Sequence, residues 1–238
     1  MLRSSKKLMS WLRAHRGVLI ALAAALFLQI AFAALASEVL EDETTAFDQA
    51  ILRAFRDTDG QPVGPSWLKG TVLNLSALGS VAVVTLIVVL AAIFLVLVRR
   101  RGEAMLLVGC TVGATITLVV LKILFGRERP TIVSALASEV DLSFPSGHSL
   151  IASAIYPTLG LLLARTFADR HLKVFVLAAA AALTLMIGFT RVYIGVHYPT
   201  DVLGGWMLGL SWAILCALLS HRLRRQGVAG TTMIVPAG

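Results

Sequence analysis

The chain has 238 residues, of which 58% are hydrophobic and 14% are charged, and its mean hydropathy is +0.85. A soluble domain of this length carries more polar surface, so the composition predicts an integral membrane protein. The formal net charge is +8. The basic residues lie between apolar stretches, where they act as topology signals, so we expect no nucleic-acid partner.

Six long apolar stretches predict six membrane-spanning helices in one domain. Each is close to the ~20 residues that a helix needs to cross the hydrocarbon core. They lie near residues 17–37, 71–98, 104–125, 146–164, 174–191 and 202–220. The expected fold is therefore an all-α integral membrane protein, a six-transmembrane helical bundle formed by residues 1–238. We expect residues 226–238 to be a disordered tail.

The first span has two interpretations. Its basic start and the triplet Ala34-Leu35-Ala36 resemble a secretory signal with its cleavage site. The apolar run is longer than the ~7–15 residues of a signal core, which favours a retained anchor. Either interpretation sends the following segment outside.

Residues 38–70 form the longest polar insert. Within it, Thr45 to Asp57 predicts a short amphipathic interfacial helix, with Phe47, Ile51 and Phe55 on one face. Thr45 is the expected cap. Such a helix would lie along the membrane surface, or pack over the lipid-facing entrance of a site.

Three polar blocks follow, each weak on its own. The first contains Lys122 and Arg129-Pro130, the second is Pro145-Ser146-Gly147-His148, and the third runs from Thr190-Arg191 through His197 to Asp201. A helix that begins at Pro145 or Ser146 would direct its first backbone N–H groups at an anion. Read alone, the second block is more often just a loop that enters a helix.

In order, the blocks read K-x-x-x-x-x-x-R-P, P-S-G-H and R-x-x-x-x-x-H-x-x-x-D. This set resembles the type 2 phosphatidic acid phosphatase superfamily of membrane lipid phosphatases, over Lys122 to Asp201. One departure is Thr190, where the family usually has Ser; Thr keeps the hydroxyl. The resemblance implies removal of phosphate from a lipid through a phosphohistidine intermediate.

The resemblance implies that His197 is the nucleophile, and chemistry suggests the other catalytic roles. Asp201, four residues on, would hold the ring and stabilise its charged form. His148 would protonate the leaving oxygen and later activate water. The alternative, non-catalytic roles are polar residues at the membrane interface for the histidines and a helix cap for Asp201.

Phosphate binding is assigned to cations and a helix start. Lys122, Arg129 and Arg191 would neutralise the phosphate, although Arg191 alone could anchor a span end. The Ser146 side chain and the Gly147 N–H would complete the cradle.

The remaining polar residues indicate no metal or cofactor. Carboxylates near the site reduce to Asp201, Glu139 and Asp141, fewer oxygen ligands than octahedral magnesium requires. Arg127 and Glu128 fall between the fixed motif positions and are expected to be solvated. The two cysteines, Cys110 and Cys216, lie in apolar runs and are expected to be small buried residues.

Charge predicts the orientation. With six spans, 14 of the 21 Lys and Arg residues and only two of the 13 acidic residues fall on the side of the termini. Positive residues stay in the cytoplasm, so both termini are expected there and all three blocks outside. The expected location is a bacterial cytoplasmic (inner) membrane.

Candidate substrates are undecaprenyl diphosphate, phosphatidylglycerophosphate and phosphatidic acid, which the motifs do not separate. An alternative is a lipid-to-lipid phosphotransferase with the same site, because an alcohol can replace water at a phosphohistidine. A transporter fits less well, because its ionisable residues belong at mid-depth. The oligomeric state stays open.

Overall fold

The computed structural model describes residues 2–137 and 141–225, and within them the side chains of residues 15–137 and 141–222. These residues form eight helices: α1 (Leu2–Leu40), α2 (Thr45–Ala54), α3 (Ser66–Ala77), α4 (Val81–Leu97), α5 (Arg101–Phe125), α6 (Gly147–Ala164), α7 (Arg170–Ile194) and α8 (Pro199–Arg225). In lipid, helices satisfy their own backbone groups, which is why apolar spans fold this way. The expected tail, 226–238, lies outside the described residues.

Five of these helices are long and apolar enough to cross a membrane, and α3 with α4 forms a sixth span if the pair counts as one. The expected all-α fold with six spans is confirmed in this form. The second span, expected near residues 71–98, is bent by 47° between α3 and α4. Ser80 starts α4 by accepting a hydrogen bond from the Val83 N–H at 3.4 Å. Tyr156 holds the bend by donating to the Leu78 carbonyl at 2.7 Å.

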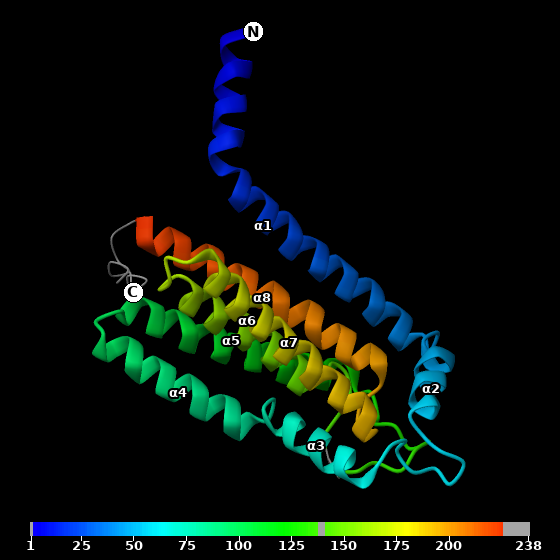
Figure 1. The fold of residues 1–238 in the computed structure, drawn as a ribbon. Coiled ribbons are helices and arrows are strands. Elements are labelled where there is room, and N and C mark those ends of the chain that lie inside the picture. The colour runs from blue at the N-terminus through cyan, green and yellow to red at the C-terminus, as the bar shows by residue number, and fades with distance from the viewer. Residues whose placement is uncertain (1, 138–140, 226–238) are drawn as a thin grey trace.

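The central helix is α6, which packs against α4, α5, α7 and α8 (Figure 1). It is the most buried of the candidate spans. The long α1 lies outside the group and packs along α8, so it faces lipid on its other side. On α1, Ala25, Phe32 and Ala36 are buried, whereas Phe27 and Ile30 are exposed.

Glycines bring α6 and α8 together. A Cβ on Gly205 would lie 2.8 Å from the Ser146 carbonyl oxygen, and one on Gly209 would lie 2.9 Å from the Ala154 amide nitrogen. Both approaches are shorter than a side chain tolerates, so α8 can sit this close only with glycine at these positions. This packing fixes the start of α8 against the start of α6.

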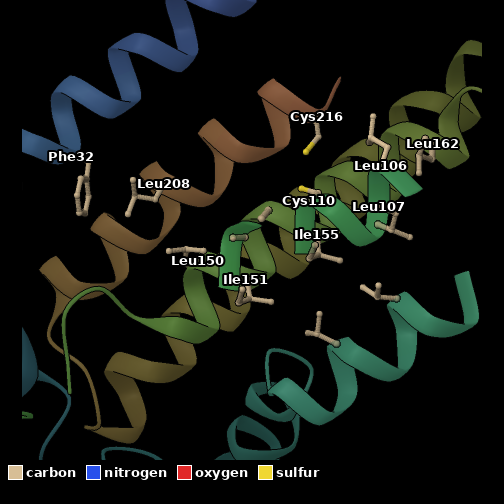
Figure 2. Close-up of a cluster of buried hydrophobic side chains, with 14 of the residues drawn as sticks. Phe32, Leu106, Leu107, Cys110, Leu150, Ile151, Ile155, Leu162, Leu208 and Cys216 are labelled. Carbon is tan, nitrogen blue, oxygen red and sulfur yellow. The ribbon is translucent and has the colours of Figure 1, made fainter. Parts of the chain in front are cut away.

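The main hydrophobic core joins α1, α4, α5, α6 and α8 (Figure 2). Phe32 of α1 and Leu208 of α8 belong to it, and Leu150 and Ile155 of α6 are fully buried within it. Cys110 and Cys216 are free and buried in the same core, as expected of small apolar-run residues.

The short helix α2 exists, and its buried residues lie beside the expected apolar face. Phe47 is 52% exposed, whereas Asp48 and Leu52 are fully buried. The helix begins at Thr45 after Thr44, and no side-chain cap bond forms there. Asp48 turns inward because it bonds to the start of α8, so α2 is held by polar contacts as well as by Leu52.

Candidate active site

The three sequence blocks meet at one end of the bundle. Lys122 lies in the last turn of α5, Gly147 and His148 are the first two residues of α6, and Asp201 lies in the first turn of α8. His197 lies in the short link between α7 and α8. The helices α5 and α7 stop at glycines with positive φ, Gly126 at 59° and Gly195 at 88°. Such left-handed caps turn the chain sharply, which brings the following residues over the end of the bundle.

A cavity of about 500 Å³ lies at this end. Its polar lining consists of Lys122, Arg129, Asp141, Gly147, His148 and His197. The other lining residues are mostly apolar and come from the α3–α4 bend, α4, α5 and α6: Gly79, Val81, Thr115, Leu118, Val119 and Ile151. A cavity with one cationic wall and one apolar wall suits a ligand that has an anionic head and a hydrocarbon chain.

His197 is oriented by a carboxylate on one side and a cation on the other. Its Nδ1 lies 3.3 Å from Oδ2 of Asp201, and its Nε2 lies 3.1 Å from Nη1 of Arg129. An arginine can only donate and a carboxylate accepts, so Nδ1 carries the proton and Nε2 keeps its lone pair. Burial lowers the pKa of His197; Asp201 opposes this effect, and the charges of Arg129 and Arg191 add to it. The ring is therefore neutral near pH 7.

Asp201 is fully buried and has several partners. Its Oδ2 accepts hydrogen bonds from the Ser143 hydroxyl and from the Tyr198 backbone N–H, the latter at 2.8 Å. The second contact is that of a capping carboxylate, so Asp201 stabilises the start of α8 as well as facing His197. Asp201 therefore contacts the imidazole and caps α8 at the same time.

Asp141 lies between the two cations of the cavity. Its carboxylate pairs with Lys122 through one oxygen and with Arg129 through the other. Lys122 also donates to the Leu142 carbonyl at 2.6 Å, and Nε of Arg129 donates to the Asp141 carbonyl at 2.7 Å. Partial burial tends to raise the pKa of Asp141, but Lys122 and Arg129 outweigh it and lower the pKa to about 2. The carboxylate therefore lies between the two cations and pairs with both.

Two of the predicted phosphate-binding residues do not line the cavity. Ser146 is fully buried, and its hydroxyl accepts a hydrogen bond from Ser149 at 3.2 Å. Arg191 is buried on α7 and donates to the Ser76 hydroxyl at 2.7 Å. The other three, Lys122, Arg129 and Gly147, line the cavity together with His148 and His197.

The expectation that Arg127 is solvated is wrong. Its side chain is 14% exposed and donates to Oδ1 of Asp201 at 2.7 Å and to Oδ2 of Asp48 at 2.8 Å. Burial tends to lower the pKa of Arg127, but the carboxylates of Asp201 and Asp48 raise it above its ordinary value. The sequence motif does not indicate Arg127, because this residue lies between the fixed positions of the first block. The available signal was its position directly after Gly126, the cap of α5.

Among the described residues, no group of three or more His, Cys, Asp or Glu side chains is arranged to hold a metal ion. The charge that a metal could supply to a phosphate is present here on Lys122 and Arg129. The chemistry available at this end of the bundle is therefore anion binding next to imidazoles.

An all-helical membrane bundle with cations and imidazoles around a cavity at one end is the arrangement of an integral membrane phosphatase. Residues 103–225 match the model of the PAP2 superfamily. The chain therefore belongs to the PAP2 superfamily and is a membrane phosphatase, which confirms the resemblance seen in the sequence blocks.

Relatives with names agree with this assignment. The chain is 29% identical over 196 residues to phosphatidylglycerophosphatase B of Bacillus subtilis, covering 82% of this chain and 93% of that protein. It is 40% identical over 72 residues to an undecaprenyl-diphosphatase of Sulfolobus acidocaldarius, covering 30% of each. The crystal structure of a transmembrane PAP2-type phosphatidylglycerolphosphate phosphatase from Bacillus subtilis superposes with a TM-score of 0.76 at 27% identity. That match covers 84% of this chain and 98% of the other.

Proposed function

We propose that this protein removes phosphate from a membrane lipid phosphate or diphosphate through a phosphohistidine on His197. The observation that carries this proposal is the cavity in which Lys122, Arg129, His148 and His197 meet an apolar wall. Cations bind the phosphate, the two imidazoles supply a nucleophile and an acid, and the apolar wall accommodates the adjoining hydrocarbon.

In the first step, the lone pair on Nε2 of His197 attacks phosphorus and the bond from phosphorus to the leaving oxygen breaks. Asp201 stabilises the imidazolium-like ring that forms by accepting from Nδ1–H. His148 gives its proton to the leaving oxygen. In the second step, water attacks the phosphohistidine, His148 takes a proton from that water, and phosphate leaves with His197 restored.

Cations stabilise the phosphoryl oxygens during both steps. Lys122 and Arg129 would exchange Asp141 for the phosphate, and Arg191 would contribute its positive charge from behind His197. The backbone N–H groups in the first turn of α6 lack helical partners and would complete the cradle at Gly147. Such donors are effective because they are already in place when the charge develops.

The substrate classes are a polyprenyl diphosphate, as undecaprenyl diphosphate, and phosphatidylglycerophosphate or phosphatidic acid. The names of the two relatives support the first two of these. The basic residues at the opposite end of the bundle, such as Arg99, Arg101 and Arg170, favour a cytoplasmic location for that end and for both termini. The site would then open to the outer side of a bacterial cytoplasmic membrane.

A phosphate-release assay on purified protein tests this proposal. The three lipids are supplied in mixed micelles with a chelator present, and His197→Ala is compared with His171→Ala, an exposed histidine at the other end of the bundle. We expect release by the wild type and His171→Ala, none by His197→Ala, and a phosphoprotein of wild-type enzyme trapped by acid-free quenching. Wild-type activity in His197→Ala would disprove the nucleophile, and reversible loss of activity with the chelator would disprove metal independence.

A further inference from the structure

A buried row of charged side chains connects α2 with the start of α8. The carboxylate of Asp48 accepts from the Thr200 backbone N–H at 3.0 Å and from the Thr200 hydroxyl at 2.6 Å. It also accepts from Nη2 of Arg127 at 2.8 Å. Nη1 of Arg127 continues the row to Oδ1 of Asp201 at 2.7 Å, and it also donates to the Thr200 hydroxyl at 2.8 Å. One guanidinium therefore lies between two fully buried carboxylates.

The two oxygens of Asp201 are divided between different partners. Oδ2 faces His197, Ser143 and the Tyr198 N–H, whereas Oδ1 is held by Arg127. The backbone adds to this arrangement, because the Ser143 N–H donates to the Arg127 carbonyl at 2.8 Å. The guanidinium also lies 4.3 Å from the centre of the Tyr198 ring, which restricts it further. By holding Oδ1, Arg127 orients the carboxylate of Asp201 so that Oδ2 faces the imidazole.

We propose that Arg127 and Asp48 are positioning residues that set the orientation and the local charge of the Asp201–His197 pair. This inference rests on the proposed function, in which His197 is the nucleophile. Arginine suits the role because its planar fork reaches both carboxylates at once, which the single ammonium of a lysine cannot do with the same geometry. Asp48 in turn balances the charge of Arg127, so that Arg127 does not cancel the effect of the negative charge of Asp201 on the imidazole.

Removing one member of the row leaves a buried charge without its counter-charge. Without Arg127, two buried carboxylates face each other, and the extra negative charge favours the protonated imidazole. Without Asp48, the positive charge of Arg127 is uncompensated and favours the neutral imidazole. Other charges near the pair stay in place in both variants: Arg129 and Arg191 beside His197, and Lys122, Asp141 and His148 around the cavity. The two variants should therefore move the titration of His197 in opposite directions.

The experiment is the pH profile of kcat/KM for phosphate release by Arg127→Gln, Asp48→Asn, the double variant and Arg127→Lys. Arg53→Gln, on the exposed face of α2, is the matched control. We expect the acid limb to rise by about 1 pH unit in Arg127→Gln and to fall in Asp48→Asn. In the double variant it should return close to wild type. Arg127→Lys should keep the wild-type limb but lower kcat about tenfold, because its charge remains and its fork is lost.

Where near-UV circular dichroism shows the same folded fraction at every pH of the profile, partial misfolding of a variant lowers only the amplitude and leaves the limb in place. If the limbs of Arg127→Gln and Asp48→Asn coincide with that of the wild type, the row serves only to anchor α2 and the proposal is wrong. It is also wrong if both limbs move in the same direction. Failure of the proposed function looks different, because the wild type would then release no phosphate or His197→Ala would remain active.

Discussion

Nη1 of Arg129 lies 3.1 Å from Nε2 of His197, the ring nitrogen opposite the one that faces Asp201. A permanent donor at this distance stabilises a lone pair on Nε2 and opposes its protonation. The same arginine also pairs with Asp141, so it belongs to both the imidazole and the anion-binding part of the cavity. Arg129 therefore adds to the effect of burial in keeping His197 neutral, and it is also the group that would bind the phosphate.

The first prediction concerns pH. Because the pKa of His197 is lowered, mainly by burial, the neutral form persists below the ordinary histidine value of about 6.5. Protonation removes the nucleophile, so activity should be lost as the pH falls through the lowered pKa. In kcat/KM profiles of the free enzyme, we expect the acid limb that reports His197 to lie below pH ~6.5. An acid limb clearly above that value would contradict the neutral assignment.

The second prediction concerns Asp201. Asp201→Asn keeps the shape of the side chain but removes the charge that stabilises the ring during attack, and its amide can present an N–H to Nδ1. We expect kcat to fall by about 10²–10⁴-fold with little change in KM, as for other carboxylates that orient a catalytic histidine. Single-turnover measurements should place the loss in the formation of the phosphoenzyme. A raised KM with unchanged kcat would instead indicate that Asp201 only shapes the binding site.

Much of the fold could be predicted from the sequence, because the lengths of the apolar runs indicate the spans. The number of spans then places the three polar blocks on the same side of the membrane, which predicts that they lie close together. The pairing of Asp48 with Thr200 could not be predicted, since it joins residues 152 positions apart. The inward position of Asp48 could not be predicted either, because periodicity groups only the apolar residues Phe47, Ile51 and Phe55. The bend at Gly79 was also not predicted, because Thr71 to Val98 contains no charged residue and has the length of one span.

The third prediction concerns Asp141, whose carboxylate pairs with Lys122 and Arg129 in the cavity. A substrate phosphate needs the same cations and has to displace it. Removing the charge with Asp141→Asn should therefore lower KM by about two- to tenfold, since partly exposed ion pairs contribute roughly 0.2–1 kcal/mol each. kcat should stay within about twofold of wild type, because chemistry follows displacement.

The pKa of about 2 keeps Asp141 charged throughout the pH range in which activity is measured. This pKa lies below the ordinary aspartate value of about 3.9. The ion pairs of Asp141 are therefore fully present above pH ~3.9 and are lost as the pH falls through about 2. The KM difference between wild type and Asp141→Asn should therefore be constant from pH 5 to 8. Asp59→Asn, on an exposed turn at the same end, is the control. A raised KM in Asp141→Asn would show that the carboxylate assists binding.

The fourth prediction tests the packing that holds the start of α8 against α6. A Cβ on Gly209 would lie 2.9 Å from the Ala154 amide nitrogen and would also meet the Leu150 carbonyl and the Ser153 hydroxyl. Two of these groups are backbone and cannot rotate away, so Gly209→Ala should destabilise the protein by about 1–3 kcal/mol.

Gly109→Ala is the matched control, because a Cβ there meets nothing within 4 Å. Removing a helical glycine at such an open site should be neutral or stabilise by roughly 0.5–1 kcal/mol. Thermal unfolding in detergent should give a lower Tm for Gly209→Ala alone, and equal Tm values for the two variants would contradict the close contact between α6 and α8.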